Sequence, residues 1–455
     1  MTNSNPIPYG RQHITDEDIQ AVVETLKSDY LTQGPHIPEF EAAFAKYVGA
    51  KYAVAVANGT AALHLCALSL GVEPGDKVIT SPITFAASAN CIRYCGGEVV
   101  FADIDRESYL LDINEVRKLL EASPKGTYKG IIPVDFAGRA VNLQAFRELA
   151  DEYGLWMIED SCHAPGGHFI DKEGNAQRCG NGQFADLAIF SFHPVKHIAA
   201  GEGGMITTNN KDLYDKLQML RTHGITKDNT RFINNIDIAI GRFNTSMTTN
   251  DAMTTNDLMT NHNPEAPNSP DQSKSQSTDN NYPNWYMEMQ TLGYNYRLTD
   301  FQAALGLSQL QRAEAGLQRR REIAAIYYEA FKNIPQITDR NHELESDQLS
   351  TVSNKNRPLS TAHRSPSNGH AYHLYVVEAE NRLSLYNHLR ANQIYAQIHY
   401  IPCHLMPYYQ ELGWKPGDME QAEAYYSQCI SLPMYPTLSE EDQELVIKRI
   451  TEFYG

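Results

Sequence analysis

A lysine stands directly after a short apolar segment, where its amine could act as a nucleophile. The segment 187–192 (LAIFSF) is followed by His193, Pro194, Val195 and Lys196. Proline interrupts strand pairing, so we expect Lys196 on a loop just beyond the edge of a sheet. A buried lysine can have a depressed pKa and become a nucleophile. A single lysine is more often an ordinary solvated side chain, so the prediction depends on the residues gathered around it.

A carboxylate ends a second apolar segment, LWMIED at 155–160. Asp160 could face a protonated ring nitrogen, a charge-assisted pair worth roughly 1.5–3 kcal/mol. The alternative is an aspartate that only forms a turn. His163, three residues further on, could stack on a ring or bond to an oxygen atom of a ligand, although a lone histidine is more often structural.

An anion-binding site is predicted at Asn58-Gly59-Thr60, between the apolar segment 51–57 and a helix over 60–70. Backbone N–H groups at a helix start, together with a hydroxyl group, bind phosphate well. The same residues also serve as a plain helix cap. Phe85, at the next junction between a turn and a helix, could stack on a flat ring or belong to the core.

These four features are what a protein must supply to use pyridoxal 5'-phosphate (PLP). The lysine forms the Schiff base, the acid faces the pyridine nitrogen, the helix start holds the phosphate and an aromatic side chain packs on the ring. Each candidate lies at a strand end or a helix start, where open α/β sheets bind their ligands. The sequence therefore predicts a PLP enzyme.

The elements that position these residues are short apolar segments separated by helical stretches. Most segments are continuously apolar, as expected for strands covered on both faces, and helices are predicted at 60–70, 84–95, 113–121 and 142–153. We expect an α/β domain with a mostly parallel sheet of about seven strands. These strands are 51–57, 77–82, 97–104, 128–136, 155–160, 187–192 and 204–209.

The remaining pattern predicts the domain organisation. Thr15 to Asp18 resembles a capping box before a helix through about Lys27, and Arg297 to about Lys332 has helical periodicity, with Arg319-Arg320-Arg321 interpreted as a solvated face. Polar composition predicts a disordered insertion at 226–284 and a shorter one at 338–370. We expect an N-terminal segment (1–14), a large cofactor-binding domain (15–332) and a small C-terminal α+β domain (333–455).

Bulk composition excludes several classes of protein. The 455 residues are 42 % hydrophobic and 20 % charged, and 55 acidic against 38 basic residues give a formal charge of −17. This balance argues against binding to nucleic acid or an anionic membrane, but permits an anionic substrate in a local pocket. The seven cysteines form no CxxC pair, so no metal site is expected. Without an apolar leader or a membrane-length segment, we expect a cytoplasmic protein.

The longer motifs resemble the DegT/DnrJ/EryC1/StrS family of sugar aminotransferases. The resemblance covers about residues 6–225 and 285–450, on both sides of the two polar segments. It is carried by NGTAAL (58–63), SPITFAASAN (81–90), EDSCHA (159–164), SFHPVKHIAAGEGGM (191–205) and GYNYRLTDFQAALGLSQL (293–310).

The family resemblance implies a fold-type I PLP enzyme that works as a homodimer with shared active sites. By motif, Lys196 is the Schiff-base lysine, Asp160 meets the pyridine nitrogen, and Gly59, Thr60 and Ser191 hold the phosphate. Asn295 would reach the phosphate from the partner subunit. His163 stands beside the 3'-oxygen, at a position where many relatives carry glutamine.

Within the family, several segments most resemble enzymes that aminate C4 of a UDP-linked 4-keto-6-deoxy-N-acetylhexosamine on the route to pseudaminic acid. These segments are PVDFAG (133–138), ITFAASAN (83–90), HPVKHI (193–198) and QIHYIPCHLMPYY (397–409). L-glutamate is the implied amino donor. The resemblance places ten residues around the sugar nucleotide: Tyr9, Asp29, Tyr30, Leu31, Thr32, Gln397, Ile398, His399, Tyr400 and Ile401.

Four alternatives remain at this point. The enzyme could aminate C3, or a dTDP-, GDP- or other UDP-linked sugar. It could be a dehydratase of the same family, but those enzymes carry histidine where this chain has Lys196. An NAD-dependent epimerase would need a glycine-rich turn after a strand, whereas Gly180 to Ala185 follows a polar loop. A non-catalytic homologue is disfavoured because the lysine, the acid and the phosphate set are all retained.

Overall fold

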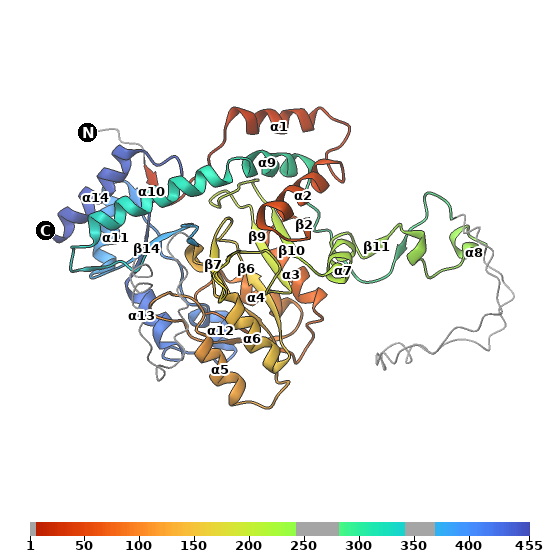
Figure 1. Cartoon of the computed structure of the whole chain (residues 1–455), viewed down its shortest axis with the longest axis horizontal. Coiled ribbons are helices and arrows are strands. Elements are labelled where there is room, and N and C mark those ends of the chain that lie inside the picture. The colour runs from red at the N-terminus through yellow and green to blue at the C-terminus, as the bar shows by residue number, and fades with distance from the viewer. Residues whose placement is uncertain (1–5, 243–281, 342–368) are drawn as a thin grey trace.

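The core of the molecule is a seven-stranded sheet. The computed structural model describes residues 6–242, 282–341 and 369–455 (Figure 1). Only β10 runs antiparallel to its neighbours, and the other strand pairs are parallel. All seven strands coincide with predicted segments, which confirms the α/β fold. Their order is β2 (Tyr52–Val56), β10 (Gly204–Thr208), β9 (Leu187–Ser191), β6 (Trp156–Asp160), β5 (Tyr128–Ile132), β3 (Lys77–Thr80) and β4 (Glu98–Phe101).

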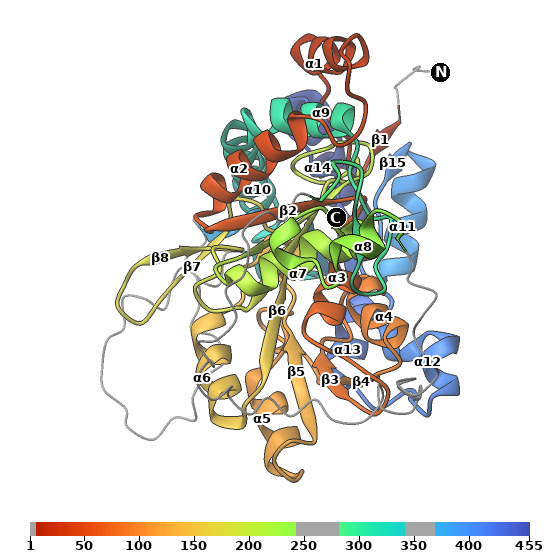
Figure 2. The same ribbon diagram turned by 90° about the vertical axis from the view of Figure 1, so that its right-hand side faces the viewer.

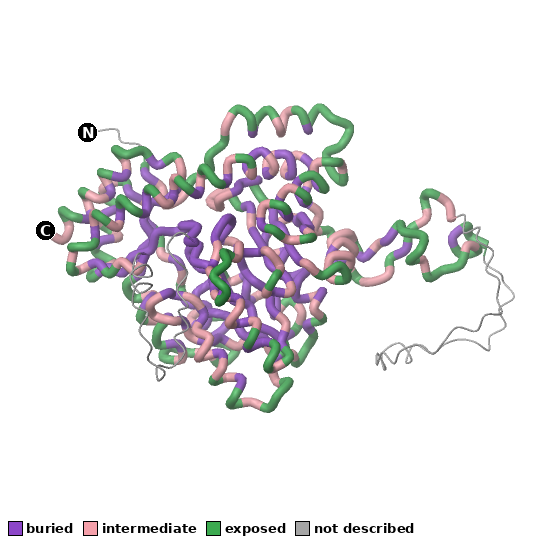
Figure 3. Tube along the Cα trace, viewed as in Figure 1, coloured by how far each residue is buried: buried purple, intermediate pink, exposed green. Residues whose placement is uncertain are grey.

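Helices cover both faces of this sheet, so its strands are almost wholly buried (Figure 3). Successive side chains of a strand point to opposite faces. Ile158 of β6 packs on one side, whereas Met157 packs on the other. Figure 2 shows α4 and α6 on opposite sides of β5 and β6. One face carries α3 (Gly59–Ser69), α4 (Ala87–Tyr94) and α7 (Lys211–Arg221), and the other carries α2 (His36–Val48), α5 (Ile113–Glu121) and α6 (Leu143–Tyr153).

The first helix begins as its sequence predicts. Thr15 and Asp18 form a capping box before α1 (Asp16–Leu26). The Asp18 carboxylate is buried and accepts hydrogen bonds from Ser308, Gln309 and Arg312. These bonds join α1 to the chain around the end of α9 (Asp300–Leu310).

The predicted helix over 297–332 is instead two helices, α9 and α10 (Ala313–Phe331), separated at residues 311–312. The interpretation of Arg319 to Arg321 as a solvated face is wrong for its central residue. Arg320 is 1 % exposed. Its Nη1 donates to the carbonyl oxygens of Tyr372, His373 and Met434. A buried guanidinium is stable there because three backbone acceptors replace the lost water.

A smaller sheet, in the order β13-β14-β16, lies in the C-terminal part of the chain. The N-terminal strand β1 (Ile7–Pro8) pairs with β15 (Ile394–Tyr395) in the same region. The domain boundaries given above stay predictions. The elements are β13 (Ile337–Thr338), β14 (Tyr375–Ala379), α11 (Arg382–Ala391), the 3-10 helix η5 (Cys403–Leu405), α12 (Pro407–Glu411), α13 (Glu420–Gln428), β16 (Cys429–Leu432) and α14 (Glu440–Tyr454).

An arm projects from the body of the molecule beside α7 (Figure 1). Its strands are β11 (Ile225–Thr226) and β12 (Glu288–Met289), followed outward by the 3-10 helix η2 (Asn229–Arg231) and α8 (Ile236–Ala239). Composition did not reveal η2 and α8, which lie within the disordered insertion predicted at 226–284. Residues 243–281 of that segment, and 342–368 of the second one, lie outside the described residues.

Two further observations concern the chemistry of the chain as a whole. All seven cysteines lie in the described ranges and are free thiols. Within those ranges no helix is both long and apolar enough to cross a membrane.

A hairpin of β7 (His168–Ile170) and β8 (Ala176–Arg178) follows β6, and a single 3-10 turn, η1 (Phe136–Gly138), follows β5. The 3-10 turn lies beside the site described next, where the Ala137 N–H donates to His163.

Candidate active site

A cavity of about 400 Å³ lies where β2, β6 and β9 end. The chain segments that leave these three strands supply most of its wall, as expected for the carboxyl edge of an α/β sheet. Ten of the predicted site residues line it: Tyr9, Gly59, Thr60, Phe85, Asp160, His163, Ser191, Lys196, His399 and Tyr400. Residues that lie far apart in the sequence therefore meet in one place.

Lys196 lies on the loop beyond β9, as Pro194 predicts. Its backbone N–H donates to the His193 carbonyl, and its amine Nζ lies 3.4 Å from His373 Nε2. Burial lowers the pKa of the Lys196 amine, an effect that the charges of Cys162 and Asp160 oppose. Desolvation thus favours the neutral amine, which is the nucleophilic form.

Asp160 is the last residue of β6 and is buried. One carboxylate oxygen accepts a hydrogen bond of 2.6 Å from the Ser88 hydroxyl, and the other accepts one of 3.1 Å from the Cys162 N–H. Ser88 comes from α4 and Cys162 from the turn after β6. Two elements therefore fix the orientation of this carboxylate in the cavity wall.

The start of α3 forms a cradle between β2 and β9. The Asn58 side chain caps the helix by accepting from the Ala61 N–H at 2.8 Å. The first N–H groups of a helix have no acceptor inside it, and at Gly59 and Thr60 they belong to the cavity wall. A Cβ at Gly59 would lie 3.0 Å from the Ser191 Cβ. Glycine thus lets the helix start approach the end of β9.

Both ring nitrogens of His163 have partners. Nδ1 accepts from the Ala137 N–H at 3.2 Å, so the proton of the neutral ring lies on Nε2, 3.2 Å from the Tyr400 hydroxyl. Burial, and then the Lys196 charge, lower the pKa of His163 well below its ordinary value. Because both nitrogens of this neutral imidazole already have hydrogen-bond partners, the ring offers its face to the cavity more readily than a nitrogen.

Aromatic rings from distant parts of the chain form one wall of the cavity. The Tyr9 ring lies 5.0 Å from that of His399, and Phe85 lies 6.3 Å from Tyr400. Burial lowers the pKa of His399 to about 3, and raises those of Tyr9 and Tyr400. All three side chains are therefore neutral around pH 7, so this wall is uncharged and aromatic.

Eight predicted residues do not line the cavity. Asn295 is exposed, and its backbone bridges to Thr222 beside the arm. Gln397 exchanges two backbone hydrogen bonds with Ser431. The exposed segment Asp29 to Thr32 faces outward from this chain. The full set is Asp29, Tyr30, Leu31, Thr32, Asn295, Gln397, Ile398 and Ile401.

Several lining residues were missed by sequence reasoning. Cys162 and His193 stand inside motifs whose neighbours were selected, and Glu202 lies in the glycine-rich turn before β10. His373 follows a polar segment and matches no spacing rule, so only the folded chain brings it to Lys196. The sequence signal nearest to it is the apolar segment that begins at Leu374.

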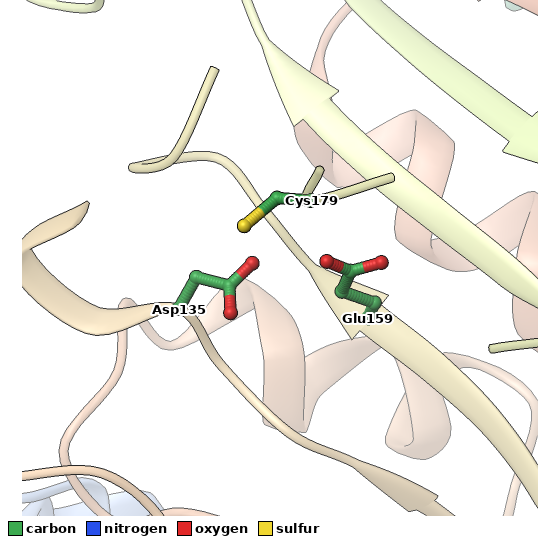
Figure 4. Close-up of side chains that lie close together, drawn as sticks. All are labelled: Asp135, Glu159 and Cys179. Atoms are coloured by element: carbon green, nitrogen blue, oxygen red, sulfur yellow. The ribbon is translucent and has the colours of Figure 1, made fainter. Parts of the chain in front are cut away.

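A second group of titratable side chains lies on the other side of β6. Asp135, Glu159 and Cys179 are buried, with their oxygen and sulphur atoms within 4.8 Å of one another (Figure 4). Donors within the protein already face both carboxylates. Asp135 accepts from the Val141 N–H and the Ser161 hydroxyl, and both Glu159 oxygens lie 3.0 Å from the Gly180 nitrogen.

Two known proteins are similar to this chain over almost its whole length. Spore coat polysaccharide biosynthesis protein SpsC of Bacillus subtilis is 34 % identical over 454 residues, covering 98 % of this chain and 96 % of that protein. The UDP-4-amino-4,6-dideoxy-N-acetyl-beta-L-altrosamine transaminase of Campylobacter jejuni is 30 % identical, covering 97 % of this chain and 95 % of that protein.

Solved structures agree with these relatives. PseC of Helicobacter pylori, an aminotransferase in the biosynthesis of pseudoaminic acid, has a TM-score of 0.75 and 26 % identity, covering 99 % of both chains. The sugar aminotransferase Spr1654 of Streptococcus pneumoniae in its PLP form has a TM-score of 0.72 and 26 % identity, covering 98 % of this chain and 97 % of that chain.

PLP is therefore the cofactor of this protein, and the cavity fits it. The volume lies in the range of small-molecule sites, the start of α3 suits a phosphate group, and Lys196 and Asp160 lie in the same wall. Residues 12–451 match the model of one aminotransferase family. The chain belongs to the DegT/DnrJ/EryC1/StrS aminotransferase family.

Proposed function

We propose that this enzyme moves the amino group of L-glutamate to C4 of a UDP-linked 4-keto-6-deoxy-N-acetylhexosamine, in the biosynthesis of pseudaminic acid. The observation that carries the reaction type is the meeting of Lys196, Asp160 and the start of α3 in one cavity. The similarity to the Campylobacter transaminase and to PseC supports the choice of sugar.

Lys196 is the proposed proton carrier. When bound, PLP supplies an electron-withdrawing ring that makes the carbon next to the transferred nitrogen acidic. The amine of Lys196, released as a substrate binds, takes a proton from one carbon and returns it to another. General acid–base catalysis of this kind typically contributes about 10²–10⁴-fold. The lowered pKa of Lys196 favours the neutral amine that such a base requires.

Asp160, Gly59, Thr60 and Ser191 are proposed to bind the cofactor. Asp160 would face the ring nitrogen and keep it protonated, since a buried carboxylate stabilises a nearby cation. Gly59, Thr60 and Ser191 would hold the phosphate group with backbone N–H and hydroxyl donors.

The aromatic residues have a different proposed task. His163 would pack its face against the ring, because both of its nitrogens already have partners, and Phe85 would cover the ring from the cavity mouth. Tyr9, His399 and Tyr400 would contact the sugar.

The proposed enzyme is a homodimer with shared sites. Asn295 and the segment Asp29 to Thr32 are exposed in this chain, which suits residues that reach a cavity of the partner subunit. Mixed dimers of Lys196→Ala and Asn295→Ala chains test this. Sharing predicts activity in the mixture well above either parent, because one of its two sites is intact. If the mixture never exceeds the parents, Asn295 serves its own chain.

A second candidate substrate is a different nucleotide-linked keto sugar. It is favoured by the relative with the higher identity, which is named for spore coat polysaccharide rather than for this transaminase. The test is an amination assay with L-glutamate against C4-keto and C3-keto sugars on UDP, with dTDP- and GDP-linked C4-keto sugars as matched controls. Mass spectrometry should show the 4-amino sugar formed from the UDP-linked N-acetylated C4 ketone. Faster amination of any other sugar would contradict the proposed substrate.

A further inference from the structure

His373 lies in the cavity wall with its Nε2 3.4 Å from the amine of Lys196. The role proposed for Lys196 leaves this histidine without a task. Within the described residues its other nitrogen, Nδ1, is buried and has no hydrogen-bond partner. The nitrogen that does have a partner is therefore the one that faces the lysine.

The backbone around His373 is anchored to the large sheet. The Ala371 N–H donates to the Gly138 carbonyl at 2.8 Å, and the Leu374 N–H donates to the Ala137 carbonyl at 3.1 Å. Gly138 has a φ of +100°, and a Cβ there would lie 2.9 Å from the backbone nitrogen of His373. Only glycine allows this close approach, which places His373 directly over the turn after β5.

Arg320 fixes the same segment from the opposite side. Its buried guanidinium, on α10, donates to the His373 carbonyl at 3.3 Å and to the Tyr372 carbonyl at 3.1 Å. Hydrogen bonds from a charged donor are worth about 1.5–3 kcal/mol. His373 is thus held by two separate elements, although its own side chain has a single polar contact.

The imidazole of His373 is neutral. Burial lowers its pKa well below the ordinary value, and the nearby positive charges of Lys196 and Arg320 lower it further. The ring also packs on that of His163, with centroids 4.3 Å apart. A neutral ring can form a hydrogen bond with the lysine amine, whereas a charged ring would repel the protonated amine.

Lysine needs such a partner in the period when it is free. Its four-carbon side chain carries about 2 kcal/mol of rotamer entropy, and an amine without a partner would sample many positions. A reacting group misplaced by about 1 Å can cost about 10²-fold in rate. A fixed acceptor or donor next to Nζ removes most of that freedom before the proton is moved.

We propose that His373 is a positioning residue, whose imidazole holds the free amine of Lys196 at the place where it captures the cofactor and moves the proton. This inference rests on the proposed role of Lys196. His373 then acts only through that lysine, so its effect should appear on rates and leave substrate binding almost unchanged.

The test compares His373→Leu with His373→Gln. Leucine fills the space without a polar atom, whereas the glutamine amide can place a polar atom near the position of Nε2. We expect kcat of His373→Leu to fall about 10–100-fold, in line with a small misplacement, with KM for both substrates within about threefold. His373→Gln should recover most of kcat.

A second readout is independent of turnover. Cofactor-free protein is mixed with PLP, and the rate of covalent capture is followed by visible absorbance over a range of pH. At high pH the amine is neutral in every variant, so the plateau rate reports its orientation alone. We expect this plateau to fall about tenfold in His373→Leu, as for a slightly misplaced nucleophile, and to be restored in His373→Gln.

His370→Leu is the matched control, because it removes another buried imidazole of the same segment that does not line the cavity. It should match the wild type in capture rate. If His373→Leu is poorly folded in thermal melts, His373→Asn replaces it, since its shorter amide cannot reach Nζ.

Two outcomes would overturn the inference. Either the plateau rate of His373→Leu (or of His373→Asn, if that variant replaces it) equals that of the wild type, or Gln and Leu are equally slow, which would indicate packing alone. The proposed function fails separately: there, Lys196→Ala would still capture PLP covalently.

Discussion

Two consecutive acids at the end of β6 lie in opposite environments. Asp160 faces the cavity and accepts from the Ser88 hydroxyl and the Cys162 N–H. Glu159 points to the other face, toward Asp135 and Cys179 (Figure 4). Because side chains alternate along a strand, one residue step changes a carboxylate with two separate donors into one that shares a buried space with a second acid.

The difference appears in the protonation of the buried pair. Burial, and then the charge of Asp135, raise the pKa of Glu159 well above its ordinary value. Burial raises the pKa of Asp135 to about 6, although Ser161 and the Val141 N–H oppose the shift. Two buried acids this close disfavour the ionised form of each other. The same functional group therefore faces the cavity on one face of β6 and belongs to a buried acid pair on the other.

The largest effect should come from removing the cavity's nucleophile. Lys196→Ala is expected to lower kcat by about 10⁴-fold or more, the upper end for general acid–base catalysis, and to remove the absorbance of covalently bound cofactor. Lys172→Ala, at an exposed lysine, is the control. A Lys196→Ala enzyme with near-normal turnover would show that another residue does this chemistry.

The two acids of β6 should separate by function. Asp160→Asn is expected to lower kcat about 10²–10³-fold, as for removal of one preorganised electrostatic partner. Glu159→Gln should keep activity within about threefold, because its side chain does not line the cavity. Steady-state kinetics with both variants measures the contrast. Equal losses would mean that the faces of the strand are not functionally distinct.

The smallest effect concerns stability. Folding raises the pKa of Asp135 to about 6. The contribution of Asp135 to the free energy of unfolding is therefore fully present below its ordinary pKa near 4, and it is lost as pH rises to about 6 and above. The loss is about 3 kcal/mol at roughly 1.4 kcal/mol per pKa unit. The free energy of unfolding of Asp135→Asn should therefore change less with pH than that of the wild type, as measured by urea unfolding between pH 4.5 and 8.

The double variant Asp135→Asn/Glu159→Gln sharpens this result. If the two acids share a proton, the free energy of unfolding at pH 8 should rise less in the double variant than the sum of the rises in the two single variants. Additive gains would instead describe two acids that titrate independently.

The sheet was predictable because its strands carry a local signal. Ala188, Ile189 and Phe190 are all apolar, since both faces of β9 are covered. The strand ends then pointed to Lys196 and Asp160, because parallel strands deliver their following loops to one edge. What sequence provides here is the identity of each element and the side of the sheet on which its loop lies.

The remainder depends on contacts between distant segments. Arg320 looks like one of three solvated arginines, and its burial follows from carbonyl groups more than 50 residues away. The pairing of Asp135 with Glu159 requires the register of two strands, and the approach of His373 to Lys196 requires the close contact at Gly138. None of these has a periodicity or a spacing that a single sequence displays.

The chain passes out of the described residues after Asn341 and returns at Gly369, and both points are firmly attached. The Asn341 side chain donates to the Val376 carbonyl at 2.9 Å, and Gly369 packs so closely on the His168 carbonyl that a Cβ would lie 2.1 Å from it. A fluorescent domain or an immobilisation tag inserted between these two anchors would therefore leave in place the backbone hydrogen bonds of Ala371 and Leu374 that hold His373.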